Sequence, residues 1–222
     1  MKKILGVLLI FMAILGFTSC NNDNNHSNDV NDSSASHVIT TSNILIAYFS
    51  CTNTTETIAK HIEAETKGTL YEIVPEVPYT EDDLKYYTDC RADKEQADQN
   101  ARPAIKGKVE KMEKYSVVFL GYPIWHGQAP RIISTFLESY DFSDKTIVPF
   151  CTSHSSGIGS SDKDLHSLAG DANWLNGRRF SGSESRNTIT EWLEELDLKF
   201  INDVSQFDLD SGKIWKCTNS YA

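Results

Sequence analysis

The chain has 222 residues, a length that predicts one domain with additional segments. Its hydrophobic residues make up 40% of the sequence, which is ample for a buried core. The formal net charge of −10 argues against a nucleic-acid-binding protein, because phosphate backbones require a basic surface. The same charge is compatible with a soluble protein or with a positively charged partner.

The N-terminal segment has the pattern of an export signal. Two lysines precede the apolar run 4–16, which is shorter than a typical transmembrane helix. The run leads into FTSC, which resembles the lipobox of bacterial lipoproteins, with Phe17 where Leu is usual and with Cys20 as the residue that receives lipid. We therefore expect residues 1–19 to be a lipoprotein signal peptide, and the protein to be an extracytoplasmic, membrane-anchored lipoprotein of the periplasm or cell surface. An ordinary secretory signal or an uncleaved anchor is the alternative.

The segment after Cys20 has the composition of a tether. Residues 21–42 are rich in Asn, Asp and Ser and contain almost no large apolar side chains. Such a segment cannot bury enough surface to offset its ordering entropy. We expect residues 20–42 to form a lipidated cysteine and a flexible tether that reaches roughly 25 Å on average.

Expected strands and helices alternate from residue 43 onward. Strands are expected at 44–49, 69–75, 116–123 and 145–152, with a weaker strand within 173–181. Helices are expected at 54–65, 129–140, 161–170 and 188–196. This alternation predicts an α/β domain over 43–199, with a doubly wound, five-stranded parallel sheet.

Two segments lie outside this alternation. The charged segment 78–105 is weakly periodic and predicts a long connection with a helical stretch, and long connections are often functional. The segment 200–222 is expected to be a C-terminal extension with two short strands around a Ser-Gly turn. The sequence indicates no function for the extension.

Polar loops follow the first, third and fourth expected strands. Their sequences are SCTNTT (50–55), YPIWHGQAP (122–130) and TSHSSGIGSS (152–161). In a doubly wound sheet, ligands bind beyond the carboxyl ends of the strands. We therefore expect these loops to converge on one ligand site.

The first loop has the composition of a phosphate cradle. It offers hydroxyl groups and the N–H groups at the start of a helix, whose dipole favours an anion, and it contains no Lys or Arg. The alternative is ordinary helix capping, since Asn53 and Glu56 have capping-box spacing. Capping accounts for only one or two of these side chains.

The other two loops suit a ring-shaped ligand. Trp125 can stack on an aromatic ring, and the alternative is a core or lid tryptophan. Gly157 and Gly159 permit close approach of the backbone to a polar ring edge. A third glycine is missing and the motif follows the fourth strand, so a dinucleotide fingerprint is not indicated.

Residues 43–198 resemble the flavodoxin-like FMN-binding family. YFSCTNTTETIA is similar to its S-x-T-G-x-T phosphate loop, and the segment 117–161 is similar to its third and fourth strands with both ring-binding loops. Asn53 replaces the usual glycine and tolerates a left-handed backbone. The segment 152–160 lacks the tyrosine that stacks on the flavin in many flavodoxins.

The resemblance implies the strand order 2-1-3-4-5, with FMN bound where the order reverses. It assigns the FMN phosphate to Ser50, Thr52, Asn53, Thr54 and Thr55. It assigns the ring environment to Pro123, Ile124, Trp125, His126, Gly127, Thr152, Ser153, His154 and Gly157. It implies no catalytic side chain, because the flavin carries the redox chemistry. No Cys/His spacing matches a known metal site.

The functional hypothesis is an FMN-binding redox protein that transfers electrons or reduces a small acceptor. Its expected partners are a redox protein or a small electron donor or acceptor, together with the membrane through the lipid anchor. The alternatives are an NAD(P)H:quinone-type reductase and a flavin-free binding or structural module on the same fold. A phosphorelay receiver is disfavoured, because Ser50 and Cys51 stand where such a domain needs a carboxylate pair.

Overall fold

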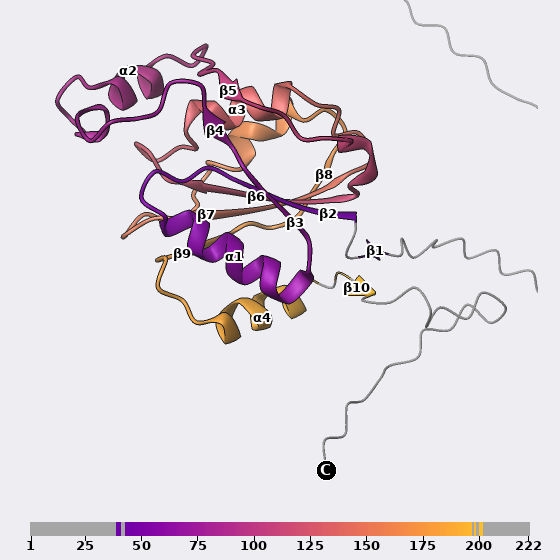
Figure 1. Cartoon of the computed structure of the whole chain (residues 1–222). Coiled ribbons are helices and arrows are strands. Elements are labelled where there is room, and N and C mark those ends of the chain that lie inside the picture. Colours follow the sequence, from indigo (N-terminus) through magenta and orange to yellow (C-terminus); the bar gives the residue numbers. More distant parts are fainter. Residues whose placement is uncertain (1–38, 41–42, 197, 199, 202–222) are drawn as a thin grey trace, which may run out of the picture. The chain divides into compact units, whose positions relative to one another are not determined.

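A parallel β-sheet forms the centre of the computed structural model, which describes residues 39–40, 43–196, 198 and 200–201 (Figure 1). The sheet contains β2 (Ile44–Tyr48), β3 (Thr69–Glu72), β6 (Val117–Pro123), β7 (Thr146–Thr152), β8 (Asn173–Trp174) and β9 (Arg178–Phe180). Its order is β3-β2-β6-β7-β8, and β9 also pairs with β7. All of these pairs are parallel. The predicted fold class and the strand order 2-1-3-4-5 are confirmed.

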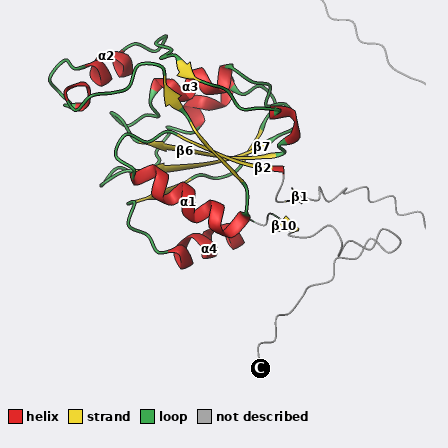
Figure 2. Cartoon of the chain, in the orientation of Figure 1, coloured by secondary structure: helices red, strands yellow, loops and turns green. Residues whose placement is uncertain are grey.

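Helices cover both faces of the sheet (Figure 2). One face carries α1 (Thr54–Thr66) and α4 (Arg186–Glu195), and the other carries α3 (Arg131–Glu138). The strands are buried on both sides, so alternate residues enter different cores. Ile44 and Ile46 pack with α1 and α4, whereas Leu45 and Ala47 belong to the core beneath α3. This double burial explains the continuous apolar runs in the sequence.

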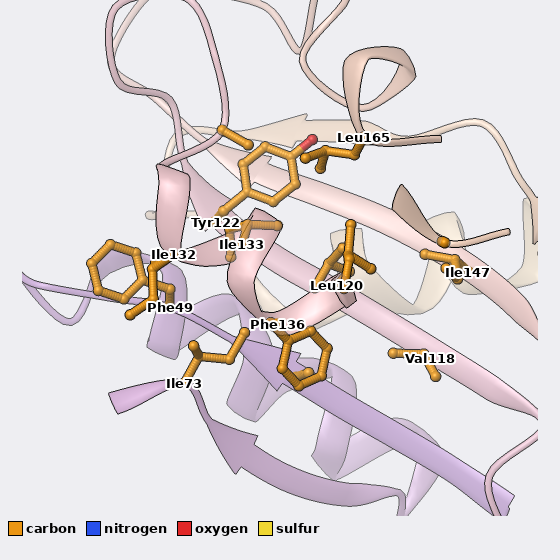
Figure 3. Packing of buried hydrophobic residues seen from close by; sticks show 14 of the residues in the cluster. Phe49, Ile73, Val118, Leu120, Tyr122, Ile132, Ile133, Phe136, Ile147 and Leu165 are labelled. Atoms are coloured by element: carbon orange, nitrogen blue, oxygen red, sulfur yellow. The ribbon is translucent and has the colours of Figure 1, made fainter. Parts of the chain in front are cut away.

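The core beneath α3 is rich in aromatic side chains (Figure 3). Phe136 of α3 contacts Phe142 with a ring-centroid distance of 5.9 Å and Tyr71 of β3 with one of 6.0 Å. Fully buried Leu120 and Tyr122 of β6 belong to the same core. This packing fixes the carboxyl end of β6, where the second polar loop begins.

Two of the expected strands are interrupted. The strand expected at 69–75 divides into β3 and β4 (Val74–Pro75), and β4 pairs with β5 (Ile105–Lys106) in a separate antiparallel two-stranded sheet. Pro75 has no N–H for a ladder in the main sheet, which suits a strand end. The strand expected within 173–181 divides into β8 and β9, with Gly177 between them. A side chain at Gly177 would collide with Pro149 of β7, so the chain packs tightly at this break.

The long connection between β4 and β5 is ordered by short helices. It contains η2 (Asp82–Leu84), a 3-10 helix, and α2 (Arg91–Ala97). The helical stretch predicted within 78–105 is therefore present.

Two further 3-10 helices lie outside this connection. The helix expected at 161–170 is the 3-10 helix η4 (Lys163–Leu168), and η3 (Met112–Lys114) precedes β6.

A small separate sheet joins the two ends of the described chain. β1 (Ile39–Thr40) pairs in parallel with β10 (Phe200–Ile201). The expected signal peptide, Cys20, most of the expected tether and the segment 202–222 lie outside the described residues. Within the described residues, no helix has the length and apolar character needed to cross a membrane.

Candidate functional site

A cavity of about 400 Å³ opens at the carboxyl ends of β2, β6 and β7. All three polar loops contribute to its wall, as the sequence predicts. Ten of the fourteen predicted cofactor-binding residues line it: Ser50, Thr52, Thr54, Thr55, Pro123, Ile124, Trp125, Thr152, Ser153 and His154. Asn53, His126, Gly127 and Gly157 do not line it. Which of these residues contact a cofactor stays a prediction.

The first loop presents free donors to this cavity. Asn53 has the left-handed backbone that the sequence predicts for it, with φ of 62°. Its side chain caps nothing, and Glu56 forms an ion pair with Lys60 at 2.6 Å, so the capping interpretation is wrong. The N-terminus of α1 is left without a side-chain cap beside the cavity. An uncapped helix N-terminus attracts an anion through its N–H groups and its dipole.

One hydroxyl of this loop is buried without a partner. Ser50 Oγ is inaccessible to solvent and makes no hydrogen bond, although Ser50 lines the cavity. Thr52 Oγ1 and Thr54 Oγ1 lie 3.1 Å apart and share a hydrogen bond at the exposed side of the loop. Buried hydroxyls are nearly always hydrogen-bonded. An unpaired hydroxyl in a residue of a cavity wall is therefore available to donate a hydrogen bond to an acceptor atom of a ligand.

Thr55 and Thr152 connect the first loop to the third. Their hydroxyl oxygens lie 2.7 Å apart, and both side chains are buried. The contact holds the start of α1 against the end of β7. Each hydroxyl can both donate and accept, so the pair retains capacity toward the cavity that both residues line.

Trp125 is largely part of the core. It is only 4% exposed, and its ring meets those of Phe49 and Tyr79 edge-on, with centroid distances of 5.4 and 5.2 Å. The alternative of a core tryptophan is therefore correct for most of this side chain. Only the small part of Trp125 that lines the cavity is available to a ligand. Tyr79, which also packs against it, comes from the long connection.

The next two residues form a tight turn beside the cavity. Trp125 and Gln128 exchange two backbone hydrogen bonds of 2.9 Å. His126 and Gly127 between them have φ of 50° and 79°, which is the type I′ pattern that favours glycine at the second position. His126 Nε2 donates to Asp93 Oδ1 at 2.8 Å, so its imidazole turns toward the long connection.

The third loop is fixed by an arginine of β9. Arg179 donates to the carbonyl oxygens of Ser153 and His154, both at 2.7 Å. This brace holds the backbone of two cavity residues. Arg179 itself does not line the cavity, and no Lys or Arg of the described chain does. An anionic ligand group would therefore meet hydroxyls and N–H groups, as the sequence predicts for the first loop.

Four further residues line the cavity without having been predicted as cofactor-binding. They are Cys51, Leu84, Tyr86 and Ser181. Leu84 and Tyr86 come from the long connection, where length alone suggested a function. Ser181 belongs to the loop SGSES after β9, and its hydroxyl-rich composition resembles that of the first loop.

The residues present fit FMN. The anion end can be bound by N–H and hydroxyl donors at a helix N-terminus, and the uncapped start of α1 and the unpaired Ser50 hydroxyl supply such donors. The ring end requires flat apolar surface, and Tyr86, Ile124 and Trp125 supply it. Both ends belong to one continuous cavity, so one molecule can occupy them together.

Comparisons with known proteins identify a matching family and similar chains. A family model described as flavodoxin matches residues 43–196. The chain is 44% identical to a candidate flavoprotein from Bacteroides eggerthii, with a TM-score of 0.66, and the match covers 70% of this chain and 98% of that one. A candidate flavoprotein from Bacteroides uniformis is 40% identical, with a TM-score of 0.66 and coverage of 69% and 98%.

A more distant structure shares the fold. It is a flavoprotein from Lactobacillus acidophilus in complex with FMN, 20% identical, with a TM-score of 0.53 and coverage of 68% of this chain and 99% of that one. No curated protein matches the chain.

Proposed function

Because the chain belongs to the flavodoxin family, with FMN as its cofactor, we propose that it is a redox protein that takes electrons from an external donor and passes them to a small acceptor. The observation that carries this proposal is the cavity wall formed by the uncapped N-terminus of α1 and the unpaired Ser50 hydroxyl. Ser50 and the first residues of α1 line the same cavity as Ile124 and Trp125.

The proposed roles of the residues follow from their chemistry. Ser50, Thr52 and Thr54 donate hydroxyl hydrogen bonds to the phosphate, together with the first N–H groups of α1. The hydrogen-bonded pair Thr55 and Thr152 holds this loop in place. When bound, FMN supplies one- and two-electron redox chemistry. The chain supplies binding, orientation and a wall that limits access of water.

The surroundings of the cavity favour an external electron donor. The described chain is a single α/β domain whose glycines after β7 do not form a dinucleotide fingerprint. A partner protein or a small reductant is therefore the proposed donor, and the acidic chain, with its net charge of −10, suits a donor with a positive surface.

The test is an anaerobic half-reaction. The FMN-loaded protein is reduced with dithionite and mixed with increasing concentrations of a small acceptor, while the flavin absorbance is followed. We expect reoxidation to depend on acceptor concentration and to saturate, because the acceptor binds before electron transfer. Reoxidation no different from that of free FMN would contradict the redox role. A protein that binds no FMN would instead support the flavin-free module.

We also propose that Cys20 carries the lipid that anchors the protein to a membrane outside the cytoplasm. The support is the lipobox-like sequence before Cys20 and the polar segment after it. The full chain should be found in the membrane fraction, and the Cys20→Ala variant should be absent from that fraction. An intact mass that shows cleavage at another residue and no lipid would contradict the proposal.

A further inference from the structure

Three aromatic side chains form a rim at the mouth of the cavity. We define the aromatic rim as Tyr86, Tyr87 and His126. The His126 ring meets Tyr86 and Tyr87 edge-on, with centroid distances of 5.1 and 5.3 Å. Tyr86 lines the cavity and is 39% exposed, whereas Tyr87 is 89% exposed and lies outside it. The rim therefore continues the cavity wall outward onto the surface.

Tyr87 lies in a turn with an unusual backbone conformation. Tyr87 has φ of 64°, a conformation that is unfavourable for a residue with a large side chain. The turn that contains it is held by Asp93, whose Oδ2 accepts the N–H groups of Thr88 at 3.0 Å and Cys90 at 3.3 Å. The other oxygen of Asp93 accepts from His126. One carboxylate thus fixes the tyrosine turn and the imidazole together.

The long connection is also anchored to the second loop. Gln96 Nε2 donates to the carbonyl oxygens of Trp125 and Ala129, both at 3.2 Å. The backbone N–H of Arg131 in turn donates to Gln96 Oε1 at 3.1 Å. These bonds join α2 to the segment that carries His126. The rim is therefore a preorganised surface, which lowers the entropic cost of binding.

The surroundings of the rim are acidic. Between residues 76 and 98 the sequence has eight acidic and three basic side chains, a net charge of −5. Such a potential disfavours anions and favours neutral or cationic ligands. The three rings also form a small surface, whereas a stable protein interface buries about 800 Å² on each partner.

We propose that the aromatic rim binds a small planar aromatic molecule, neutral or cationic, as the electron acceptor of the protein. The proposal rests on the redox function proposed above. Stacking on Tyr87 would hold the acceptor at the mouth of the cavity, next to Tyr86, which belongs to the rim and to the cavity wall. An acceptor of the quinone class takes up two electrons, supplied by the donor through the FMN-loaded protein, and two protons from water, and leaves as the hydroquinone.

The test measures equilibrium binding of 2-methyl-1,4-naphthoquinone to the full chain, with and without FMN. Tyr87→Ala should weaken binding about 2- to 12-fold, the loss expected for one aromatic contact. Tyr87→Phe keeps the ring and should stay within about twofold of the unmodified chain. Val77→Ala is the control, because Val77 is an exposed apolar residue of the same connection outside the rim. FMN affinity should be unchanged in all three variants, since none of these residues lines the cavity.

Two comparisons complete the test. The anionic 1,4-naphthoquinone-2-sulfonate should bind more weakly than the neutral quinone at low salt, and the difference should shrink as salt screens the acidic surface. Unchanged quinone affinity in Tyr87→Ala would overturn the proposal, and slower electron transfer from that variant to cytochrome c would identify a protein-docking surface instead. Quinone binding is measured with and without FMN. A failure of the chain to bind FMN is therefore distinguished from a failure of the aromatic rim to bind the quinone.

Discussion

Replacement of Ser50 by alanine should weaken FMN binding while leaving the empty protein at least as stable. Ser50 Oγ is buried and has no partner, so its removal breaks no hydrogen bond in the ligand-free fold. An unpaired buried hydroxyl costs about 1–3 kcal/mol, so the free energy of unfolding should hold or rise. A hydrogen bond to a charged group is worth about 1.5–3 kcal/mol. Ser50→Ala should therefore raise the Kd for FMN about 10- to 150-fold.

Ser116→Ala is the matched control. Ser116 Oγ is also buried and unpaired, but Ser116 precedes β6, at the opposite edge of the sheet from the cavity. Its replacement should affect stability as Ser50→Ala does and should leave FMN affinity unchanged. Affinity is measured by the quenching of FMN fluorescence, and stability by urea denaturation of the FMN-free protein. An FMN affinity of Ser50→Ala within twofold of the unmodified protein would refute the assignment of this hydroxyl to the phosphate.

Three further predictions concern one residue of the cavity wall and two residues that support the loops around it. Thr55→Val leaves the buried Thr152 hydroxyl unpaired and should lower the free energy of unfolding by about 1–3 kcal/mol in urea denaturation. Gly182→Ala places a Cβ 2.1 Å from Thr54 Cγ2 at a φ of 95°, so thermal denaturation should show lower stability, and FMN titration weaker binding. Partial desolvation acts to raise the pKa of Asp93, but backbone N–H groups and an imidazole lower it to about 2. Its charge therefore stabilises the fold above about pH 4, the pKa of an unfolded aspartate, and this stabilisation is lost as the pH falls toward 2. The difference in Tm between the unmodified chain and Asp93→Asn should shrink over that window.

The sequence was sufficient to predict the sheet and the meeting of its loops. Strands buried on both faces leave continuous apolar runs, and the alternation of these runs with helices fixes a parallel sheet. The carboxyl ends of parallel strands meet at one edge, so the positions of the polar residues after β2, β6 and β7 are enough to assign them to one cavity. The left-handed Asn53 followed from the chemistry of its side chain.

The contribution of the long connection could not be predicted from local patterns. Tyr86 reaches the cavity because Gln96 and Asp93 anchor α2 and its preceding turn to residues about thirty positions later in the chain. Nothing in the sequence near Tyr86 encodes such distant contacts. The burial of Trp125 has the same origin, since Tyr79 of that connection packs against its ring.

One continuous cavity should bind FMN through neutral donors. The most direct measurement is a titration of the FMN-free full chain with FMN, followed by flavin fluorescence and visible absorbance. We expect saturation at one FMN per chain, and an affinity much less sensitive to salt than that of a site with lysine or arginine ligands, because no basic side chain of the described chain lines the cavity. Absence of saturable binding, or binding that salt abolishes, would contradict the account.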